Sequence, residues 1–146
     1  MNEKKLVVKK SLLPGAGKGL FTQEFIPKSS LIIEYTGKVK TWKDIQDSTV
    51  FNGYVFYITR NHVVDAMKTL KALARYANDA KGINRVKGLR NNAEYAVKKN
   101  KVFIKATMNI PAGAEIMVGY GKEYWASIRH NKKINIKSAA KNKIAA

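Results

Sequence analysis

A glycine-rich turn near the N-terminus is the first segment whose residue types could bind a ligand. It reads Gly15-Ala16-Gly17-Lys18-Gly19. A Walker phosphate-binding loop needs four residues between its first glycine and its Gly-Lys pair, and then Ser or Thr, so this segment is not one. A dinucleotide-binding fingerprint must lead into a helix, whereas residues 20–25 have the composition of a strand. On its own, the segment predicts a tight turn.

Polar and aromatic residues at the ends of predicted elements are further candidates for chemistry. Tyr35 and Tyr120 each end a β-rich run, and Trp125 closes the last apolar stretch. Taken alone, the tyrosines suit core positions with their hydroxyls at the surface, and the tryptophan suits an anchor for a tail. Asn78 follows a periodic apolar segment, where asparagine is a favourable helix C-cap. These interpretations compete with the functional ones below.

Composition argues against metal, disulfide and membrane chemistry. The chain has no cysteine and only two histidines, His62 and His130, which are far apart in the sequence. A structural zinc site or a disulfide needs more such residues, so we expect neither. The sequence has no apolar run long enough for a membrane span and no secretory signal pattern. We expect an intracellular protein, cytoplasmic in a bacterium or nuclear in a eukaryote.

Short motifs follow one another along the chain in a specific order and at specific intervals. They occupy residues 17–21, 26–28, 31–37, 64–66, 74–78, 91–95, 110–116, 120–121 and 124–125. Each motif alone is weak evidence. In this order they resemble the SET domain of protein lysine methyltransferases that use S-adenosyl-L-methionine, and the resemblance covers about residues 8–125.

The resemblance implies a cofactor site. Gly17, Lys18 and Gly19 correspond to the glycine motif whose backbone receives the methionine part of S-adenosylmethionine, because a residue without Cβ lets a ligand approach the main chain. Asn78 corresponds to an asparagine that contacts the amino-acid end of the cofactor. Asp79 stands next to it, where the family has histidine, and is expected to border the same site.

The resemblance also assigns roles to aromatic residues. Tyr120 corresponds to the catalytic tyrosine, which borders the cofactor, and Trp125 to an aromatic residue that stacks on adenine in compact family members. Tyr35 corresponds to a tyrosine that lines the lysine channel, and Tyr95 is expected to form another wall. In the family, the segment holding Asn78 and the segment ending at Tyr120 pass through one another as a pseudoknot.

The chain departs from the family pattern directly after the asparagine. Residues 79–81 read Asp-Ala-Lys where the family usually has His-Ser-Cys, and Asn91-Asn92 takes the place of a Pro-Asn pair. The cysteine-rich segment that follows many SET domains is not expected in a chain without cysteine. These departures keep an alternative open, namely a non-catalytic basic module with a SET-like fold that binds nucleic acid or a protein tail.

Methyl transfer to lysine requires an uncharged amine held in line with the methyl donor. Free lysine has a pKa of ~10.4, so its amine is protonated at neutral pH. An apolar channel lowers that pKa by desolvation, and Tyr35, Tyr95 and Tyr120 would form its walls. The Tyr120 hydroxyl would orient the amine or polarise the methyl group. This reaction needs no metal ion and no covalent nucleophile.

The elements that must position these residues are mostly short strands. Strand composition occurs at residues 5–9, 20–25, 31–35, 54–59, 63–64, 102–104 and 115–120. Residues 66–77 repeat apolar side chains every three to four positions, which predicts a short helix, and residues 42–47 suit one helical turn. Residues 81–92 have loop composition. The pattern predicts an α+β, β-rich domain with one short helix, and the resemblance implies that this domain has the SET-domain (β-clip-like) fold.

Positive charge dominates the composition, with 28 Lys and Arg against 10 Asp and Glu and a net charge of +18. Such a charge favours nucleic acid or another polyanion as a partner, although a lysine-rich surface without any such partner is the alternative. A small DNA-compacting protein is a third interpretation, which rests on charge alone.

Domain boundaries and partners follow from the distribution of this charge. We predict a SET domain over residues 1–128 and a basic tail over residues 129–146 that contacts nucleic acid non-specifically. The expected substrate is a lysine in a protein, such as a histone or a DNA-associated protein. A basic histone tail would need a local acidic groove, for which the candidate residues are Glu34, Asp44, Asp47, Asp65 and Glu123. The oligomeric state is not predicted.

Overall fold

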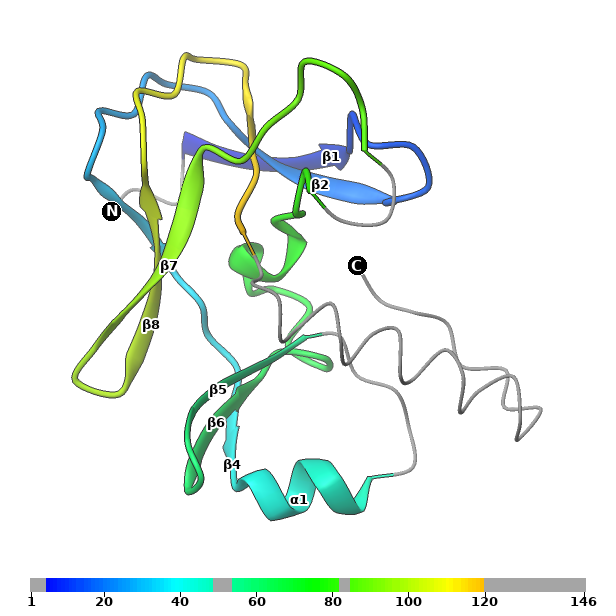
Figure 1. Ribbon diagram of the computed structural model, residues 1–146, viewed down its shortest axis with the longest axis vertical. Helices are drawn as coiled ribbons and strands as arrows, with labels where there is room; N and C mark the ends of the chain where they lie inside the picture. Colours follow the sequence, from blue (N-terminus) through cyan, green and yellow to red (C-terminus); the bar gives the residue numbers. More distant parts are fainter. Residues whose placement is uncertain (1–4, 49–53, 82–84, 120–146) are drawn as a thin grey trace.

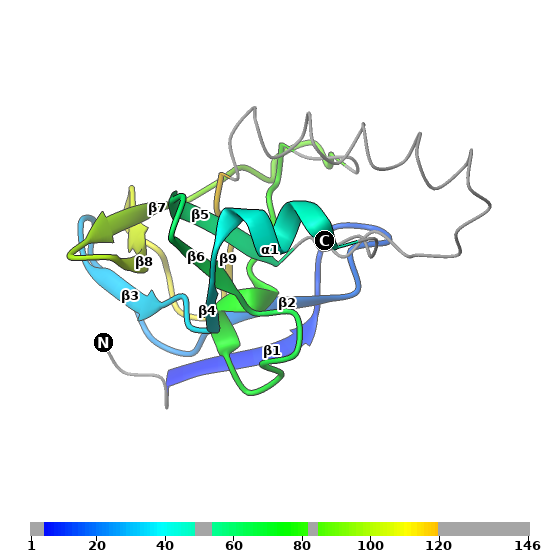
Figure 2. The ribbon, with the colours of Figure 1, turned by 90° about the horizontal axis from the view of Figure 1, so that it is seen from below.

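Three small antiparallel sheets form the framework of the computed structural model, which describes residues 5–48, 54–81 and 85–119. In these residues the sheets surround a 3-10 helix, η2 (Leu73–Tyr76), and the α-helix α1 (Trp42–Asp47) lies at the periphery (Figure 1). Figure 1 shows α1 at the opposite end of the molecule from the first two strands, and Figure 2 views the molecule from the end at which α1 lies. No helix of the described residues is long and apolar enough to cross a membrane.

The first sheet joins the two ends of the described chain. Its strands are β1 (Leu6–Lys10), β2 (Lys18–Thr22) and β9 (Glu115–Ile116), in the order β1-β2-β9. β1 and β2 form a hairpin around the glycine-rich turn. β9 pairs with β2 through Leu20↔Ile116 and Phe21↔Glu115. This pairing places β9 next to the strand that follows the glycine-rich turn.

The other two sheets are built from the middle of the chain. One has the order β3-β8-β7, from β3 (Leu31–Glu34), β8 (Lys101–Ala106) and β7 (Ala93–Lys98). The other has the order β4-β6-β5, from β4 (Lys38–Lys40), β6 (His62–Asp65) and β5 (Val55–Thr59). All of these strand pairs are antiparallel. The strand-rich α+β class predicted from the sequence is therefore confirmed.

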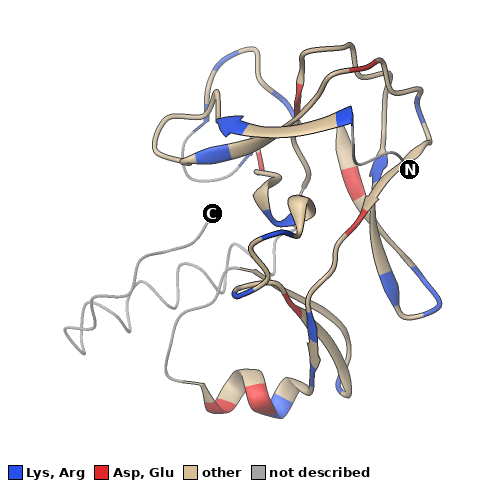
Figure 3. Ribbon diagram, turned by 180° about the vertical axis from the view of Figure 1, so that it is seen from behind, with Lys and Arg blue, Asp and Glu red and all other residues tan. Residues whose placement is uncertain are grey.

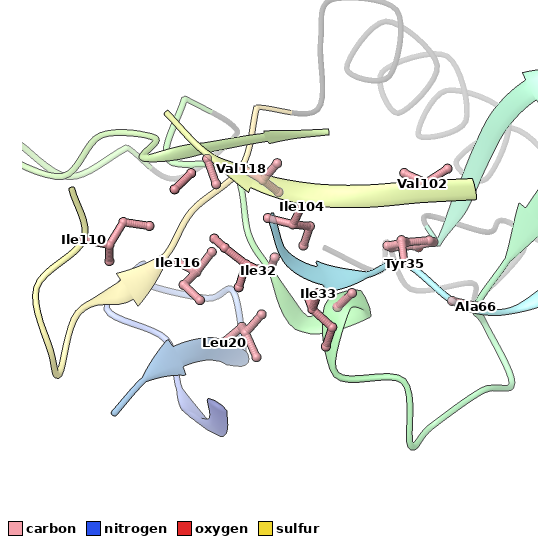
Figure 4. Close-up of a cluster of buried hydrophobic side chains, with 14 of the residues drawn as sticks. Leu20, Ile32, Ile33, Tyr35, Ala66, Val102, Ile104, Ile110, Ile116 and Val118 are labelled. Atoms are coloured by element: carbon pink, nitrogen blue, oxygen red, sulfur yellow. The ribbon is translucent and has the colours of Figure 1, made fainter. Parts of the chain in front are cut away.

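One hydrophobic core lies where the three sheets meet. It includes Leu20 of β2, Ile33 of β3, Ile104 of β8 and Ile116 of β9, each at most 1% exposed (Figure 4). Burying an aliphatic side chain of this size contributes about 1.5–3 kcal/mol, so these contacts fix the position of β2 and β9. The site described below is attached to this core.

The segment after β9 passes between two other parts of the chain. The Val118 backbone N–H donates to the Asn78 carbonyl oxygen at 2.8 Å, and on the other side the Asn92 N–H donates to the Met117 carbonyl oxygen at 2.9 Å. The Asn92 side-chain oxygen also accepts a hydrogen bond from the Met117 N–H at 2.9 Å. Residues 117–118 therefore lie between the segments around residues 78 and 92.

The helix predicted over residues 66–77 is wrong in length and type, because only Leu73–Tyr76 forms a helix, of the 3-10 kind. The Asp65 carboxylate accepts a hydrogen bond from the Met67 N–H at 2.9 Å, and the Arg75 guanidinium donates to the Met67 carbonyl at 3.1 Å. These side chains hold the preceding residues in turns. The single turn predicted at residues 42–47 is an α-helix, α1.

Candidate functional site

A buried carboxylate lies beside the glycine-rich turn. Glu115 is 4% exposed and accepts three hydrogen bonds, from the Ser11 hydroxyl at 2.7 Å, the Leu12 N–H at 2.8 Å and the Asn78 side-chain amide at 3.4 Å. Among the residues that the structure describes, no Lys or Arg forms an ion pair with Glu115. These three hydrogen bonds satisfy the carboxyl oxygens, as is required of a buried polar group. Sequence analysis did not select this residue.

The close approach of β2 to this carboxylate requires glycine at position 19. A Cβ atom at Gly19 would lie 2.9 Å from Glu115 Cδ and 3.2 Å from Ser11 Cβ, and even closer to Glu115 Oε2. Gly17 has a positive φ of +72° and no atom within 4 Å of the place where its Cβ would be. Glycine adopts this conformation without the penalty that a side chain brings. The turn thus presents uncovered backbone at Gly17 and tight packing at Gly19.

Asn78 connects the glycine-rich turn to the segment after β9. Its side-chain nitrogen donates to the Lys18 carbonyl oxygen at 3.0 Å, and its backbone carbonyl accepts from the Val118 N–H at 2.8 Å. The residue is 2% exposed, and its side-chain oxygen Oδ1 has no hydrogen-bond partner among the described residues. A buried acceptor without a donor costs about 1–3 kcal/mol. An amino group that reached this oxygen would supply the missing donor.

The carboxylate of Asp79 accepts hydrogen bonds from two neighbouring segments of the chain. Its Oδ1 accepts hydrogen bonds from the Lys81 N–H at 2.8 Å and from the Asn91 side-chain amide at 2.9 Å. The Asn91 side-chain oxygen in turn accepts from the Ala80 N–H at 2.8 Å. Residues 79–81 are thereby held against the segment that leads into β7. Asp79, which is 6% exposed, thus orders the backbone next to Asn78.

A second group of candidate residues forms an aromatic cluster. The Tyr35 and Tyr95 rings meet edge to face with centroids 5.9 Å apart, and Phe56 lies 4.8 Å from Tyr95 and 6.4 Å from Tyr35. Tyr35 is 6% exposed, and its hydroxyl donates to the Tyr54 carbonyl oxygen at 2.7 Å. Because that hydroxyl proton is engaged, the part of Tyr35 that contacts the rest of the cluster is its ring. Phe56 was not selected from the sequence, although it lies in a conspicuous aromatic strand.

A buried arginine of η2 contacts two tyrosines, one of which is bonded to this cluster. The Arg75 guanidinium lies 4.2 Å from the centroid of the Tyr54 ring and 5.3 Å from that of Tyr76. It is 7% exposed, and its Nε has no partner within the described part of the chain. Such stacking is worth about 2 kcal/mol when desolvated. Arg75 therefore fixes Tyr54, whose carbonyl holds the hydroxyl of Tyr35.

The predicted site residues thus fall into two groups. Gly17, Lys18, Gly19, Asn78 and Asp79 lie along the β2 turn and the segment after η2, whereas Tyr35 and Tyr95 lie in the aromatic cluster. Both groups border the same hydrophobic core, which contains Leu20, Ala77 and Tyr35 and against which Tyr95 packs. Tyr120 and Trp125 lie outside the described residues, as does the tail over residues 129–146.

Three of the acidic residues considered for a substrate groove have partners within the chain. Hydrogen bonds from the Thr41 backbone, and next from its side chain, lower the pKa of Asp44, which caps α1. Asp47 and Asp65 each form an ion pair with a lysine, at 3.1 Å and 2.7 Å. Glu123 lies outside the described residues. In the part of the chain that the structure describes, no group of three His, Asp or Glu side chains could hold a metal ion.

Comparisons with known proteins agree with this architecture. The sequence model of the SET domain matches residues 17–121. Among solved structures, the methyltransferase domain of human PR domain-containing protein 2 is similar, with a TM-score of 0.57 and 19% sequence identity. The match covers 83% of this chain and 79% of that domain, and at this identity it supports the fold alone. No curated protein matches the sequence significantly.

Proposed function

The chain belongs to the SET-domain family, whose members are generally protein lysine methyltransferases, and from this premise we propose that it methylates the ε-amine of a lysine in a protein substrate with S-adenosylmethionine. The SET domain is proposed to extend over residues 1–128. The cofactor would be held by Gly17, Lys18, Gly19, Asn78 and Trp125, with Tyr120 beside it.

The unsatisfied oxygen of Asn78 carries the proposal. It is a buried acceptor, next to a glycine turn whose backbone is uncovered at Gly17. A buried polar atom without a partner is rare in native proteins, and a functional ligand is one accepted reason for it. The amino group of S-adenosylmethionine is a donor of the required kind. Asp79 is proposed to act here through the backbone it orders, because its carboxylate is engaged with Asn91.

The aromatic cluster supports the second half of the reaction. S-Adenosylmethionine, when bound, supplies a methyl group on a positively charged sulfur. The rings of Tyr35, Phe56 and Tyr95 would exclude water from the incoming lysine side chain. Desolvation disfavours the ammonium form, so the pKa of that lysine falls toward neutrality and the free amine becomes available. Tyr120, which follows the last described residue, is proposed to orient the amine.

Single-turnover methylation with radiolabelled cofactor tests the proposal. The probe is a peptide library with one lysine in a randomised context, and the variant is Tyr120→Phe, which removes one oxygen and keeps the ring. We expect transfer to fall by orders of magnitude while cofactor affinity, measured by calorimetry, changes little, because the hydroxyl acts in the transition state. Tyr57→Phe is the matched control, because it also removes one tyrosine hydroxyl. Tyr57 is 47% exposed on β5 and contacts the Trp42 ring, and it is not part of the aromatic cluster.

Two results would contradict the proposal. Full activity of the Tyr120→Phe protein would show that this hydroxyl is not catalytic. A wild-type protein that binds no S-adenosylmethionine would favour the non-catalytic module, for which the Asp-Ala-Lys sequence after Asn78 is the main support.

A further inference from the structure

The end of the β7–β8 hairpin is a narrow, two-stranded projection. β8 pairs with β3 from Lys105 to Phe103, and the Val102 carbonyl accepts one more hydrogen bond from the Tyr35 N–H at 2.7 Å, so the hairpin continues beyond the third strand with the pair Lys98↔Lys101. In two perpendicular views this end lies at the outer edge of the molecule (Figures 1 and 2). The two residues of the turn, Lys99 and Asn100, both have positive φ, of 48° and 62°. This is the conformation of a type I′ turn, which fixes the direction of the hairpin.

The charges at this end do not favour the folded hairpin. Lys98 lies directly opposite Lys101, and like charges in directly opposed positions are destabilising. Lys99 occupies a left-handed position that Asn, Asp or Gly adopts at lower cost. All three lysines are exposed, and none forms an ion pair within the described ranges. Figure 3 shows this end of the hairpin coloured for basic residues. Nearer the body of the protein, by contrast, Lys105 lies opposite an acid, Glu94.

A polyanionic partner would convert this unfavourable arrangement into a binding surface. We propose that the lysine tip, defined as Lys98, Lys99 and Lys101 on the turn of β7–β8, contacts the phosphates of double-stranded DNA. A two-stranded β-ribbon is narrow enough to enter the major groove, which is about 12 Å wide. Lysines on both strands and on the turn can then reach phosphates on either side of the groove.

The position of the lysine tip connects this contact with the aromatic cluster. Tyr95 of the cluster and Lys98 of the tip lie on the same short strand, β7. A protein bound to the same DNA would therefore be held near the aromatic cluster. This consequence rests on the proposed methyltransferase activity, whereas the DNA contact does not.

Salt-dependent DNA binding measures the contact directly. The probe is a 20-base-pair duplex, and the variant is Lys98→Gln/Lys99→Gln/Lys101→Gln in the full chain. Three lost phosphate contacts reduce the slope of log Kd against log salt by about 2.7. Between 50 and 200 mM salt, the Kd of the variant should therefore rise by a factor about 40-fold smaller than the Kd of the wild type does. The matched control, Lys28→Gln/Lys68→Gln/Lys71→Gln, removes the same charge from exposed lysines on other loops. Its slope should stay close to that of the wild type.

Thermal melting of the same variants provides a second readout. The melting temperature of the tip variant should equal or exceed that of the wild type, because the opposed lysines are gone. Equal salt slopes for the tip variant and the control would overturn the proposal, since the DNA would then respond to net charge alone. An equal loss of affinity for a polyglutamate peptide of matched charge would overturn the assignment to DNA. Because methyl transfer is not measured, these outcomes are independent of the test with Tyr120→Phe.

Discussion

Replacing Gly19 by alanine tests the packing that joins the glycine-rich turn to the end of the domain. The new Cβ would lie 2.9 Å from Glu115 Cδ and 3.2 Å from Ser11 Cβ, so the carboxylate must move. The movement strains the bonds from Ser11, Leu12 and Asn78. A hydrogen bond to a charged group is worth about 1.5–3 kcal/mol, and overpacking a buried site costs about 1–3 kcal/mol.

We therefore expect Gly19→Ala to lower the free energy of unfolding by roughly 2–4 kcal/mol, after allowing for the small gain from a stiffer unfolded chain. For a domain of this size that loss lowers the melting temperature by roughly 5–12 °C. Urea denaturation followed by far-UV circular dichroism measures it. Gly119→Ala is the matched control, because its Cβ would meet only the Asn91 side-chain nitrogen, at an ordinary distance of 3.5 Å.

A double-mutant cycle identifies the cause of the loss. Glu115→Ala removes the nearest atoms that the Gly19 Cβ would meet and leaves only the contact with Ser11 Cβ at 3.2 Å, so Gly19→Ala should cost less in that background. The coupling between the two positions should then be about 2 kcal/mol, within the range for residues in contact. Additive costs would refute the argument, because they would show that the clash with Glu115 is not what makes Gly19 necessary.

Two further predictions concern single hydrogen bonds. Tyr35→Phe removes one of two hydrogen bonds to the Tyr54 carbonyl, which keeps the bond from the Ala66 N–H at 3.0 Å. The free energy of unfolding should therefore fall by about 1 kcal/mol in urea titrations, and an unchanged value would assign Tyr35 to packing alone. The pKa of Asp44 is lowered in the folded state, so its contribution to α1 is present above the unfolded pKa and is lost as pH falls through the folded pKa. NMR titration of the Thr41 amide should follow that loss in acid and show none in Asp44→Asn.

Patterns of local origin could be read from the sequence. The aromatic and β-branched residues around 54–59 form β5, and the glycine-rich turn joins β1 to β2. β7 was missed because Ala-Glu-Tyr-Ala-Val-Lys has mixed strand propensity and depends on pairing along the whole of β8. Such pairing depends on tertiary context, which outweighs intrinsic strand preference.

The residues of the candidate site also divide into those that a local sequence pattern reveals and one that it does not. Gly17, Gly19 and Asn78 were found because they belong to short motifs in a recognisable order. Glu115 was missed because a single glutamate in a strand has the appearance of a solvent-exposed residue. Its burial depends on Ser11, which is 104 positions away in the sequence. A local sequence pattern cannot predict a contact between residues that far apart in the sequence.

The passage of residues 117–118 between the segments around residues 78 and 92 has a consequence for folding kinetics. Both flanking segments must be positioned before the last strand can form its backbone hydrogen bonds on either side. Pairings of such large sequence separation form late and slow the folding of a small domain. The amide protons of Met117 and Val118 should therefore exchange with solvent only when the whole domain unfolds. In a ribosome-bound chain, the contacts of the Glu115 carboxylate with Asn78 and Gly19 would form only after β9 has left the ribosome.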